Sequence, residues 1–173
     1  MGIIIGQTGN GYQFKLSPED ADLLELAWTG VQRCRHDRLY KYVLRRKRRG
    51  KGAPQIGMHR VILQRMMGGL ELPRLVVCDH KDGDTLNNCR ENLRPASMAQ
   101  NRHNGVCDRN NRSGYRGVSW NTKRKEWHCT IMYRKKHYFI GWFKDKHEAA
   151  KRYNQKALSL YGEFAKLNVI CQT

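Results

Sequence analysis

The stretch VVCDHKDGDTLNNCRENLRPASMAQN, residues 76–101, has the most informative pattern in the first part of the chain. Its apolar start predicts a buried strand that ends at Asp79 and His80. The following KDGDTLNNCREN is rich in Asp, Asn and Gly, whose short side chains and backbone freedom favour loops. LRPA predicts a second antiparallel strand. Ser97 and Gln100 have the spacing of a capping box, so a helix should begin near residue 98 and carry Asn101 in its first turn.

This order of strand, loop, strand and helix can bring Asp79, His80 and Asn101 to one side of the unit. A carboxylate and an amide oxygen form an incomplete, oxygen-only ligand set, which suits Mg²⁺. The imidazole of His80 can take a proton from water near neutral pH, because its unperturbed pKa is about 6.5. In a basic protein these groups together predict metal-dependent phosphodiester hydrolysis.

The charge of the chain points to a polyanionic partner. Its 173 residues include 33 Lys and Arg against 15 Asp and Glu, a formal charge of +18. Residues 1–112 hold 20 basic and 11 acidic side chains, and residues 113–173 hold 13 and 4, so each part carries +9. Both parts should therefore be drawn to nucleic-acid phosphate. A solvated basic surface and an RNA-binding protein are the alternatives that charge alone leaves open.

Cysteine spacing and the absence of long apolar runs predict the redox state of the thiols and the cellular location of the protein. The six cysteines include no C-x-x-C pair, so we expect no structural zinc and reduced thiols. The first residues lack the pattern of a secretory signal, and nowhere do 18 apolar residues run together. We therefore expect an intracellular protein that does not bind membranes.

The N-terminal residues 1–56 are predicted to be β-rich. Residues 11–16 alternate as a short strand, and SPEDADLLELAW, with Ser17 and Asp20 as a capping box, predicts a capped helical turn. Residues 39–46 and 55–63 predict two strands joined by a basic, glycine-bearing hairpin.

The run RRKRRGK, residues 45–51, forms the tip of this predicted hairpin. We expect it to rest on a phosphate backbone, with Arg46, Arg48 and Arg49 as the contacts. A solvated turn and a nuclear-address signal are the alternative interpretations.

The second part of the chain has a different pattern. Residues 105–112 predict a linker, because they are polar and lack periodicity. Three aromatic and β-branched runs then follow, YRGVSW, WHCTIMY and HYFIGWF, and they predict a three-stranded antiparallel meander. Asp145 and Glu148 form a capping box, and Gly162 ends the helix that they begin. The whole chain is thus expected to be α+β, with this sheet packed on one helix.

Residues 57–104 resemble the HNH (His-Asn-His) endonucleases, in the ββα-metal form of phage-borne and homing enzymes. The resemblance rests on His59-Arg60, the DHKDG core at 79–83, Asn87-Asn88, Asn92-Leu93 and Gln100-Asn101. It implies that residues 57–104 form the nuclease module as one domain.

The resemblance also implies roles for individual residues. His80 would activate water, Asp79 and Asn101 would hold one divalent metal, Mg²⁺ or Mn²⁺, and Asn92 would brace the loop between the strands. The products would be 5′-phosphate and 3′-hydroxyl ends. His59 is interpreted as a packing residue, and His103 as a residue of the helix surface, with an extra ligand or phosphate contact as its alternative.

Residues 113–173 are similar to the Apetala-two or ethylene-response-factor DNA-binding domain. The resemblance is carried by the YRGV run at 115–118, Trp127, Gly141 with Phe143, the EAA run at 148–150, Tyr153, and Leu167-Asn168. It implies that the outer face of the sheet lies in the major groove of double-stranded DNA while the helix packs behind it. The residues expected on that face are Arg116, Trp120, His128, Thr130, Met132, His137 and Phe139. Phosphate contacts are expected from the turn residues Lys123, Arg124, Lys125, Arg134, Lys135 and Lys136.

Together these features predict a two-module DNA endonuclease, a monomer or weak homodimer, in the cytoplasm of a bacterial or phage-infected cell. The C-terminal sheet would select a site and the ββα-metal centre would cut nearby. The alternative is a non-catalytic, sequence-specific DNA-binding regulator with a degenerate nuclease module.

Overall fold

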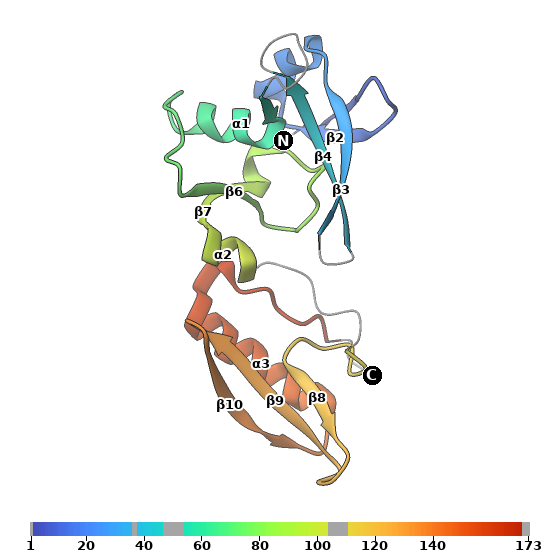
Figure 1. Cartoon of the computed structure of the whole chain (residues 1–173), viewed down its shortest axis with the longest axis vertical. Coiled ribbons are helices and arrows are strands. Elements are labelled where there is room, and N and C mark those ends of the chain that lie inside the picture. Colours follow the sequence, from blue (N-terminus) through green and yellow to red (C-terminus); the bar gives the residue numbers. More distant parts are fainter. Residues whose placement is uncertain (1, 36–37, 47–53, 104–110, 171–173) are drawn as a thin grey trace. The chain divides into compact units, whose positions relative to one another are not determined.

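The computed structural model describes residues 2–35, 38–46, 54–103 and 111–170. The chain divides into two compact units, Met1–Asn101 and Arg102–Thr173 (Figure 1). Both units combine small antiparallel sheets with helices, so the predicted α+β class is confirmed. Arg48, Arg49 and most of the predicted linker 105–112 lie outside the described residues. In the described part of the chain, none of the helices has the length and apolar character that a membrane crossing requires.

The N-terminal unit is built from short strands and helices that follow one another closely. Its described strands are β1 (Ile4–Gln7) paired with β2 (Gln13–Leu16), then β3 (Thr29–Arg35), β4 (Arg38–Arg46) and β5 (Gln55–Gly57) in one sheet, and β6 (Val76–His80) paired with β7 (Leu93–Ser97). Its helices are the 3₁₀ segments η1 (Pro18–Glu25) and η2 (Arg90–Asn92) and the α-helices α1 (Met58–Met66) and α2 (Met98–His103).

The strand predicted over residues 55–63 is wrong beyond Gly57, where β5 ends and α1 begins. Met58 and Ile62 are spaced one helical turn apart and are fully buried on the same side. A short apolar run does not distinguish a strand from a buried helix by periodicity alone, and here the packing of the helix decides. A Cβ on Gly57 would stand 2.4 Å from Cε1 of the His59 ring, so glycine is the residue that fits at this junction.

The helical turn predicted after Ser17 is present as η1, but its predicted capping box is wrong. The Ser17 hydroxyl accepts a hydrogen bond from the Arg90 backbone N–H at 2.9 Å instead of capping its own helix. The fully buried Asp20 carboxylate accepts from Arg90 at 2.7 and 2.9 Å and from Arg65 at 3.2 Å. These contacts tie the N-terminal residues to the segment that follows the predicted nuclease loop.

Asp20→Ala is therefore expected to lower the free energy of unfolding by about 2–3 kcal/mol, because it removes the acceptor of several charge-assisted hydrogen bonds. Arg65 and Arg90 are 35% and 32% exposed, so both can turn to water, which limits the loss. Urea unfolding measures the effect. Asp22→Ala is the matched control, because Asp22 also pairs with Arg65 but is exposed, and little change is expected there. Equal losses in the two variants would contradict the importance of the buried network.

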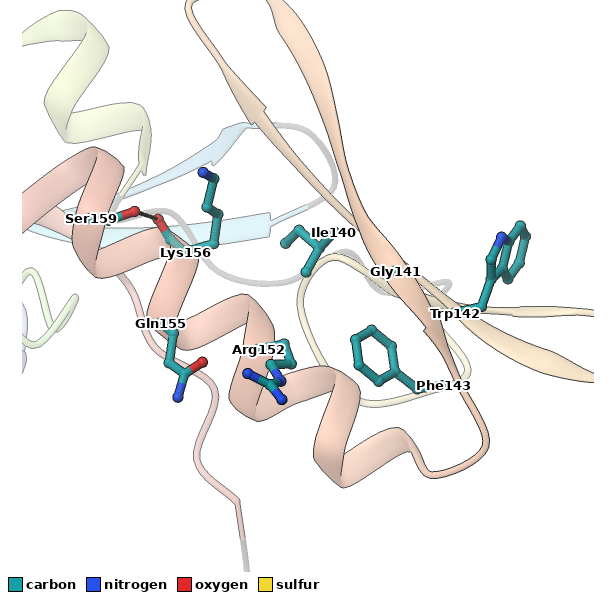
Figure 2. A pocket seen from close by; sticks show the side chains of 8 residues that line it. All are labelled: Ile140, Gly141, Trp142, Phe143, Arg152, Gln155, Lys156 and Ser159. Carbon is teal, nitrogen blue, oxygen red and sulfur yellow. Dashed lines mark hydrogen bonds between the residues drawn. The ribbon is translucent and has the colours of Figure 1, made fainter.

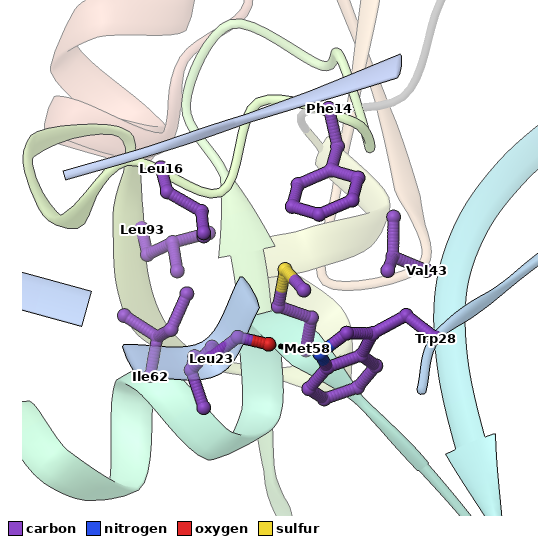
Figure 3. Packing of buried hydrophobic residues seen from close by; sticks show 8 residues of the cluster. All are labelled: Phe14, Leu16, Leu23, Trp28, Val43, Met58, Ile62 and Leu93. Carbon is purple, nitrogen blue, oxygen red and sulfur yellow. Dashed lines mark hydrogen bonds between the residues drawn. The ribbon is translucent and has the colours of Figure 1, made fainter. Parts of the chain in front are cut away.

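One hydrophobic cluster holds the N-terminal unit together (Figure 3). Its buried members are Phe14, Leu16, Leu23, Trp28, Val43, Met58, Ile62 and Leu93. Trp28 is the largest member, and its indole N–H has a hydrogen-bond acceptor inside the unit, the Leu23 carbonyl at 2.7 Å. The first five members precede residue 57, and the last three follow it. The cluster is therefore shared between residues 1–56 and the segment with the HNH pattern.

The C-terminal unit has the predicted meander. Its strands β8 (Val118–Asn121), β9 (Glu126–Tyr133) and β10 (Lys136–Phe143) form a sheet in the order β10-β9-β8, with all pairs antiparallel. The helix α3 (Lys146–Tyr161) packs on this sheet and is followed by the 3₁₀ turn η3 (Gly162–Phe164) (Figure 1). The predicted start and end of the helix are confirmed, since Asp145 accepts from the N–H groups of His147 and Glu148 and Gly162 is the C-cap.

The helix and the sheet of this unit share a second cluster. Its buried members are Val118, Cys129, Ile131, Ala149, Ala150, Tyr153 and Ala157. Gly117 lets the sheet approach Tyr153, because a Cβ there would stand 2.3 Å from its ring. Along β9, Cys129 and Ile131 are buried and Met132 is exposed, as the alternation of side chains along a strand requires.

Candidate active site

The β6–β7 hairpin presents the predicted catalytic residues. Its register pairs Asp79 with Arg94 and His80 with Leu93, at the end of the hairpin where the loop begins. Asp79 is 2% exposed and His80 is 6% exposed. The sequence placed both residues at the end of a strand, and the structure adds that both are largely buried there.

The loop between the two strands is held by Asn92. Its Oδ1 accepts from the Asp82 N–H at 3.1 Å, and its Nδ2 donates to Asp82 Oδ1 at 3.0 Å and to the Asn87 carbonyl at 2.8 Å. The Asn87 amide donates in turn to Asp82 Oδ2 at 2.8 Å. One buried side-chain amide therefore joins Asp82 to the Asn87 carbonyl within the loop.

Arg94 is a residue of the site that the sequence did not single out. Its guanidinium donates through Nε and Nη2 to Asp79 Oδ2, each at 2.8 Å, and its side chain is 10% exposed. The buried Asp79 carboxylate is thus compensated and its orientation fixed. The antiparallel register could have indicated this pair, because it places residues 79 and 94 opposite each other once the loop ends are known.

His80 lies between two other side chains of the N-terminal unit. Its Nε2 is 3.4 Å from Asn88 Oδ1, and its ring meets the edge of the His59 ring with centroids 5.3 Å apart. Burial lowers the pKa of His80, although the contact with Asn88 and the nearby carboxylates of Asp82 and Asp79 oppose that shift. A lowered pKa keeps the imidazole neutral near pH 7, the form that can accept a proton.

His59 has the surroundings of the packing residue that was predicted. Burial lowers its pKa to about 3, with the nearby His80 and Arg60 acting in the same direction. Its buried Nδ1 finds no hydrogen-bond partner among the described residues, and its ring also contacts Tyr42, with centroids 5.9 Å apart. His59 is therefore neutral near pH 7 and packs with its ring against that of His80.

Asn101 lies in α2, directly after β7. The capping box predicted for this helix is confirmed, because Ser97 N–H donates to Gln100 Oε1 at 2.8 Å and Gln100 N–H donates to Ser97 Oγ at 3.2 Å. Asn101 itself is exposed. The structure thus brings Asp79, His80 and Asn92 together on one hairpin and places Asn101 on the helix that follows.

The donor chemistry of Asp79 and Asn101 fits a hard divalent cation, since both offer oxygen. In the described part of the chain, no three His, Cys, Asp or Glu side chains gather into a metal-binding group. Both contacts of Arg94 described above are to Oδ2 of Asp79, so an ion held by Asp79 would share this carboxylate with the guanidinium.

The C-terminal unit carries the residues predicted to face DNA. The outer face of its sheet, which we define by His128, Met132 and Phe139, carries exposed side chains, with Met132 52% and Phe139 57% exposed. Trp120 was expected on this face, and that prediction is wrong. Trp120 pairs with Trp127 in the register, their ring centroids are 5.0 Å apart, and Trp120 follows the buried Val118 by two residues, so its side chain lies on the opposite face. The His128 ring stacks on Phe139 with centroids 5.4 Å apart. It also contacts Trp142, which the sequence did not single out and which lies under the Arg124 guanidinium at 4.8 Å.

The other predicted DNA contacts differ in their surroundings. Exposed positions are occupied by Arg46 at the end of β4 and by Lys123, Arg124, Lys125, Arg134, Lys135, Lys136 and His137, whereas Thr130 is partly buried. Arg116 is also partly buried and lies by the Tyr153 hydroxyl, where it opposes the burial that raises the pKa of Tyr153 to about 12. Arg116 therefore lies on the side of the sheet that packs on α3, where Tyr153 is buried, rather than on the outer face.

A groove of about 620 Å³ lies between β10 and α3 (Figure 2). Its lining residues are Ile140, Gly141, Trp142, Phe143, Arg152, Gln155, Lys156 and Ser159. All of them belong to the C-terminal unit, and none belongs to the centre around His80. The groove is therefore not assigned a role in phosphodiester hydrolysis.

Comparison with known proteins identifies a family domain in this chain. A family model described as HNH endonuclease matches residues 57–103. A curated relative, Protein 3.8 of Escherichia phage T7, is 32% identical over 96 residues, which cover 55% of this chain and 78% of the relative. No solved structure matches the chain.

Proposed function

Because the chain belongs to the family that includes Protein 3.8 of Escherichia phage T7 and carries an HNH endonuclease domain at residues 57–103, we propose that it is a metal-dependent DNA endonuclease. The observation that carries the proposal is the hairpin end at Asp79 and His80, with its loop locked by Asn92, inside the matched segment. The phage relative supports action in the cytoplasm of a phage-infected or bacterial cell.

In this proposal His80 is the general base. Its lowered pKa leaves the ring neutral near pH 7, and it takes a proton from the water that attacks the phosphate. Asp79 and Asn101 would hold one Mg²⁺ or Mn²⁺, and Asn92 keeps the loop in place. The bound metal would stabilise the charge that develops on the scissile phosphate and on the departing 3′ oxygen. The expected products are 5′-phosphate and 3′-hydroxyl ends.

Purified full-length protein with supercoiled plasmid and Mg²⁺ tests this function. Nicked or linear DNA is expected with Mg²⁺, and EDTA should abolish its formation. Product that persists in EDTA would argue against a metal-dependent reaction. The absence of cleavage with Mg²⁺ and with Mn²⁺ would refute the endonuclease.

The ion pair between Arg94 and Asp79 gives a second candidate function some support. A nuclease module that no longer binds metal could keep the Asp79 carboxylate, because the buried Arg94 guanidinium compensates its charge. The protein would then be a DNA-binding regulator. Such a regulator would shift DNA on a gel and leave it intact in the plasmid assay. We favour the nuclease because Asp79, His80 and Asn101 are all present.

We also propose that residues 113–173 form the DNA-binding domain and use the outer face of the sheet. The support is the exposed surface that Met132 and Phe139 form on that face, with the His128 ring stacked on Phe139. Within the described residues, the non-glycine residues with positive φ are Lys125 (55°), Arg134 (48°) and Lys135 (65°), and all lie in turns of this sheet. Glycine or asparagine suits such positions better. Basic side chains stand at these three positions despite the cost of a positive φ, which fits a role in phosphate contact.

Lys135→Gly tests whether Lys135 stands in this turn for phosphate contact rather than for folding stability. The variant is expected to fold at least as stably as the parent, because it relieves a positive φ worth about 1 kcal/mol. Its DNA affinity should fall, and the slope of log K against log salt should decrease in magnitude by about 0.9, the value for one lost phosphate contact. Fluorescence anisotropy at several salt concentrations measures both quantities.

Lys151→Ala is the control for this prediction, because Lys151 is exposed on α3, away from the turns of the sheet. It should leave the salt slope unchanged. An unchanged slope in Lys135→Gly would show that this turn does not touch the backbone of the DNA.

A further inference from the structure

Asn88 is fully buried and held in place by the N-terminal strand β2. Its backbone N–H donates to the Lys15 carbonyl at 2.9 Å, and the Lys15 N–H donates to the Leu86 carbonyl at 2.9 Å. Lys15 and Asn87 also form a parallel β-bridge. These bonds fix the loop backbone on both sides of Asn87, so the Asn88 side chain has a defined direction.

The orientation of the Asn88 amide follows from its partners. Its Nδ2 donates to the Leu86 carbonyl at 3.3 Å, and a carbonyl can only accept, so the nitrogen belongs at that end. The oxygen therefore faces His80, with Oδ1 at 3.4 Å from Nε2. An amide oxygen can accept a hydrogen bond only from a nitrogen that carries a proton.

We propose that Asn88 is a positioning residue, which holds His80 as the Nε2–H tautomer and makes Nδ1 the atom that accepts the proton from water. The His59 ring edge, with its centroid 5.3 Å from that of His80 and its plane at 62°, limits rotation of the imidazole from another side. The catalytic consequence rests on the proposed function. The tautomer itself does not.

The proton balance is consistent with this role. Nδ1 takes the proton of the attacking water, the water oxygen bonds to phosphorus, and the 3′ oxygen leaves with the electron pair of the broken bond and is protonated by solvent. The imidazolium that results keeps its Nε2–H on Asn88 Oδ1. The contact is therefore made before and after proton transfer, and the ring need not turn during the step.

Long-range ¹H–¹⁵N correlation spectra of the full chain, recorded without DNA or metal, test the proposal. His80→Gln assigns the signals of His80 by removing them. The parent should show the pattern of an Nε2–H imidazole. Asn88→Leu should lose this single pattern and lower kcat by about tenfold to a hundredfold with little change in KM, as supporting groups of this kind do. Asn88→Asp, which keeps an acceptor at the same place, should retain the tautomer.

An Nδ1–H imidazole in the parent would overturn the proposal, as would a folded Asn88→Leu variant with the parental tautomer and kcat. If thermal unfolding shows that Asn88→Leu does not fold, the spectra of the parent and of Asn88→Asp decide, and loss of the tautomer in Asn88→Asp then counts against it. A parent that does not cut DNA refutes the proposed function, whereas the tautomer reports on Asn88 alone.

Discussion

His80→Ala is expected to slow DNA cleavage by about a hundredfold to ten-thousandfold, the usual contribution of a positioned general base. DNA affinity should not change, because His80 is 6% exposed and the basic surface remains intact. Burial lowers the pKa of His80, so the parent holds a neutral imidazole at pH 7 and the variant has no replacement for it. Single-turnover rates on supercoiled plasmid, with gel retention of a short duplex, measure the two effects.

The control for this prediction is His147→Ala. His147 belongs to the C-terminal unit, where its Nδ1 lies 2.9 Å from the Tyr115 hydroxyl, and its loss should leave the cleavage rate near that of the parent. A His80→Ala protein that cuts as fast as the parent would remove His80 from the chemistry. The base would then have to be sought elsewhere in the unit.

A fragment of residues 57–104 is expected to remain unfolded, whereas residues 1–112 should fold and cut DNA with reduced site preference. The shorter fragment keeps Met58, Ile62 and Leu93 but loses the five cluster members that cover them, Phe14, Leu16, Leu23, Trp28 and Val43. So small a chain cannot bury enough apolar surface without them. It also loses the bonds from Ser17 and Asp20 to Arg90.

Circular dichroism with urea titration distinguishes the two fragments. A cooperative transition is expected only for residues 1–112, and plasmid nicking should follow the same division. A folded, active 57–104 fragment would show that the N-terminal strands are dispensable. If the 1–112 fragment folds but has no activity, the C-terminal unit would have to take part in catalysis rather than in site selection.

Local patterns predicted much of both units. The end of a strand at Asp79 and His80, the capping box of Ser97 and Gln100, and the meander with its helix start at Asp145 all appear as expected. Each of these features depends on residues near one another in the sequence. Capping, turn formation and alternation act over a few residues, so they can be recognised without knowledge of the fold.

The predictions from the sequence were wrong where contacts with residues distant in the sequence determine the local structure. Residues 58–63 form helix rather than strand because Met58 and Ile62 bury into a cluster supplied by residues before 57. The Ser17 hydroxyl does not cap its helix because the Arg90 N–H reaches it from another part of the chain. Arg116 was expected on the outer face and lies by Tyr153 instead.

The α+β class, the strand and loop that carry Asp79, His80 and Asn92, and the basic character of the protein could all be predicted from residue patterns. Three features became visible only in the folded chain: Arg94 compensates Asp79, Asn88 and His59 flank His80, and residues before 57 complete the core of the first unit. Strand ends and loops follow from the types of neighbouring residues, and net charge follows from composition. Burial, ion pairing and imidazole orientation depend on which distant groups the fold brings within a few ångströms.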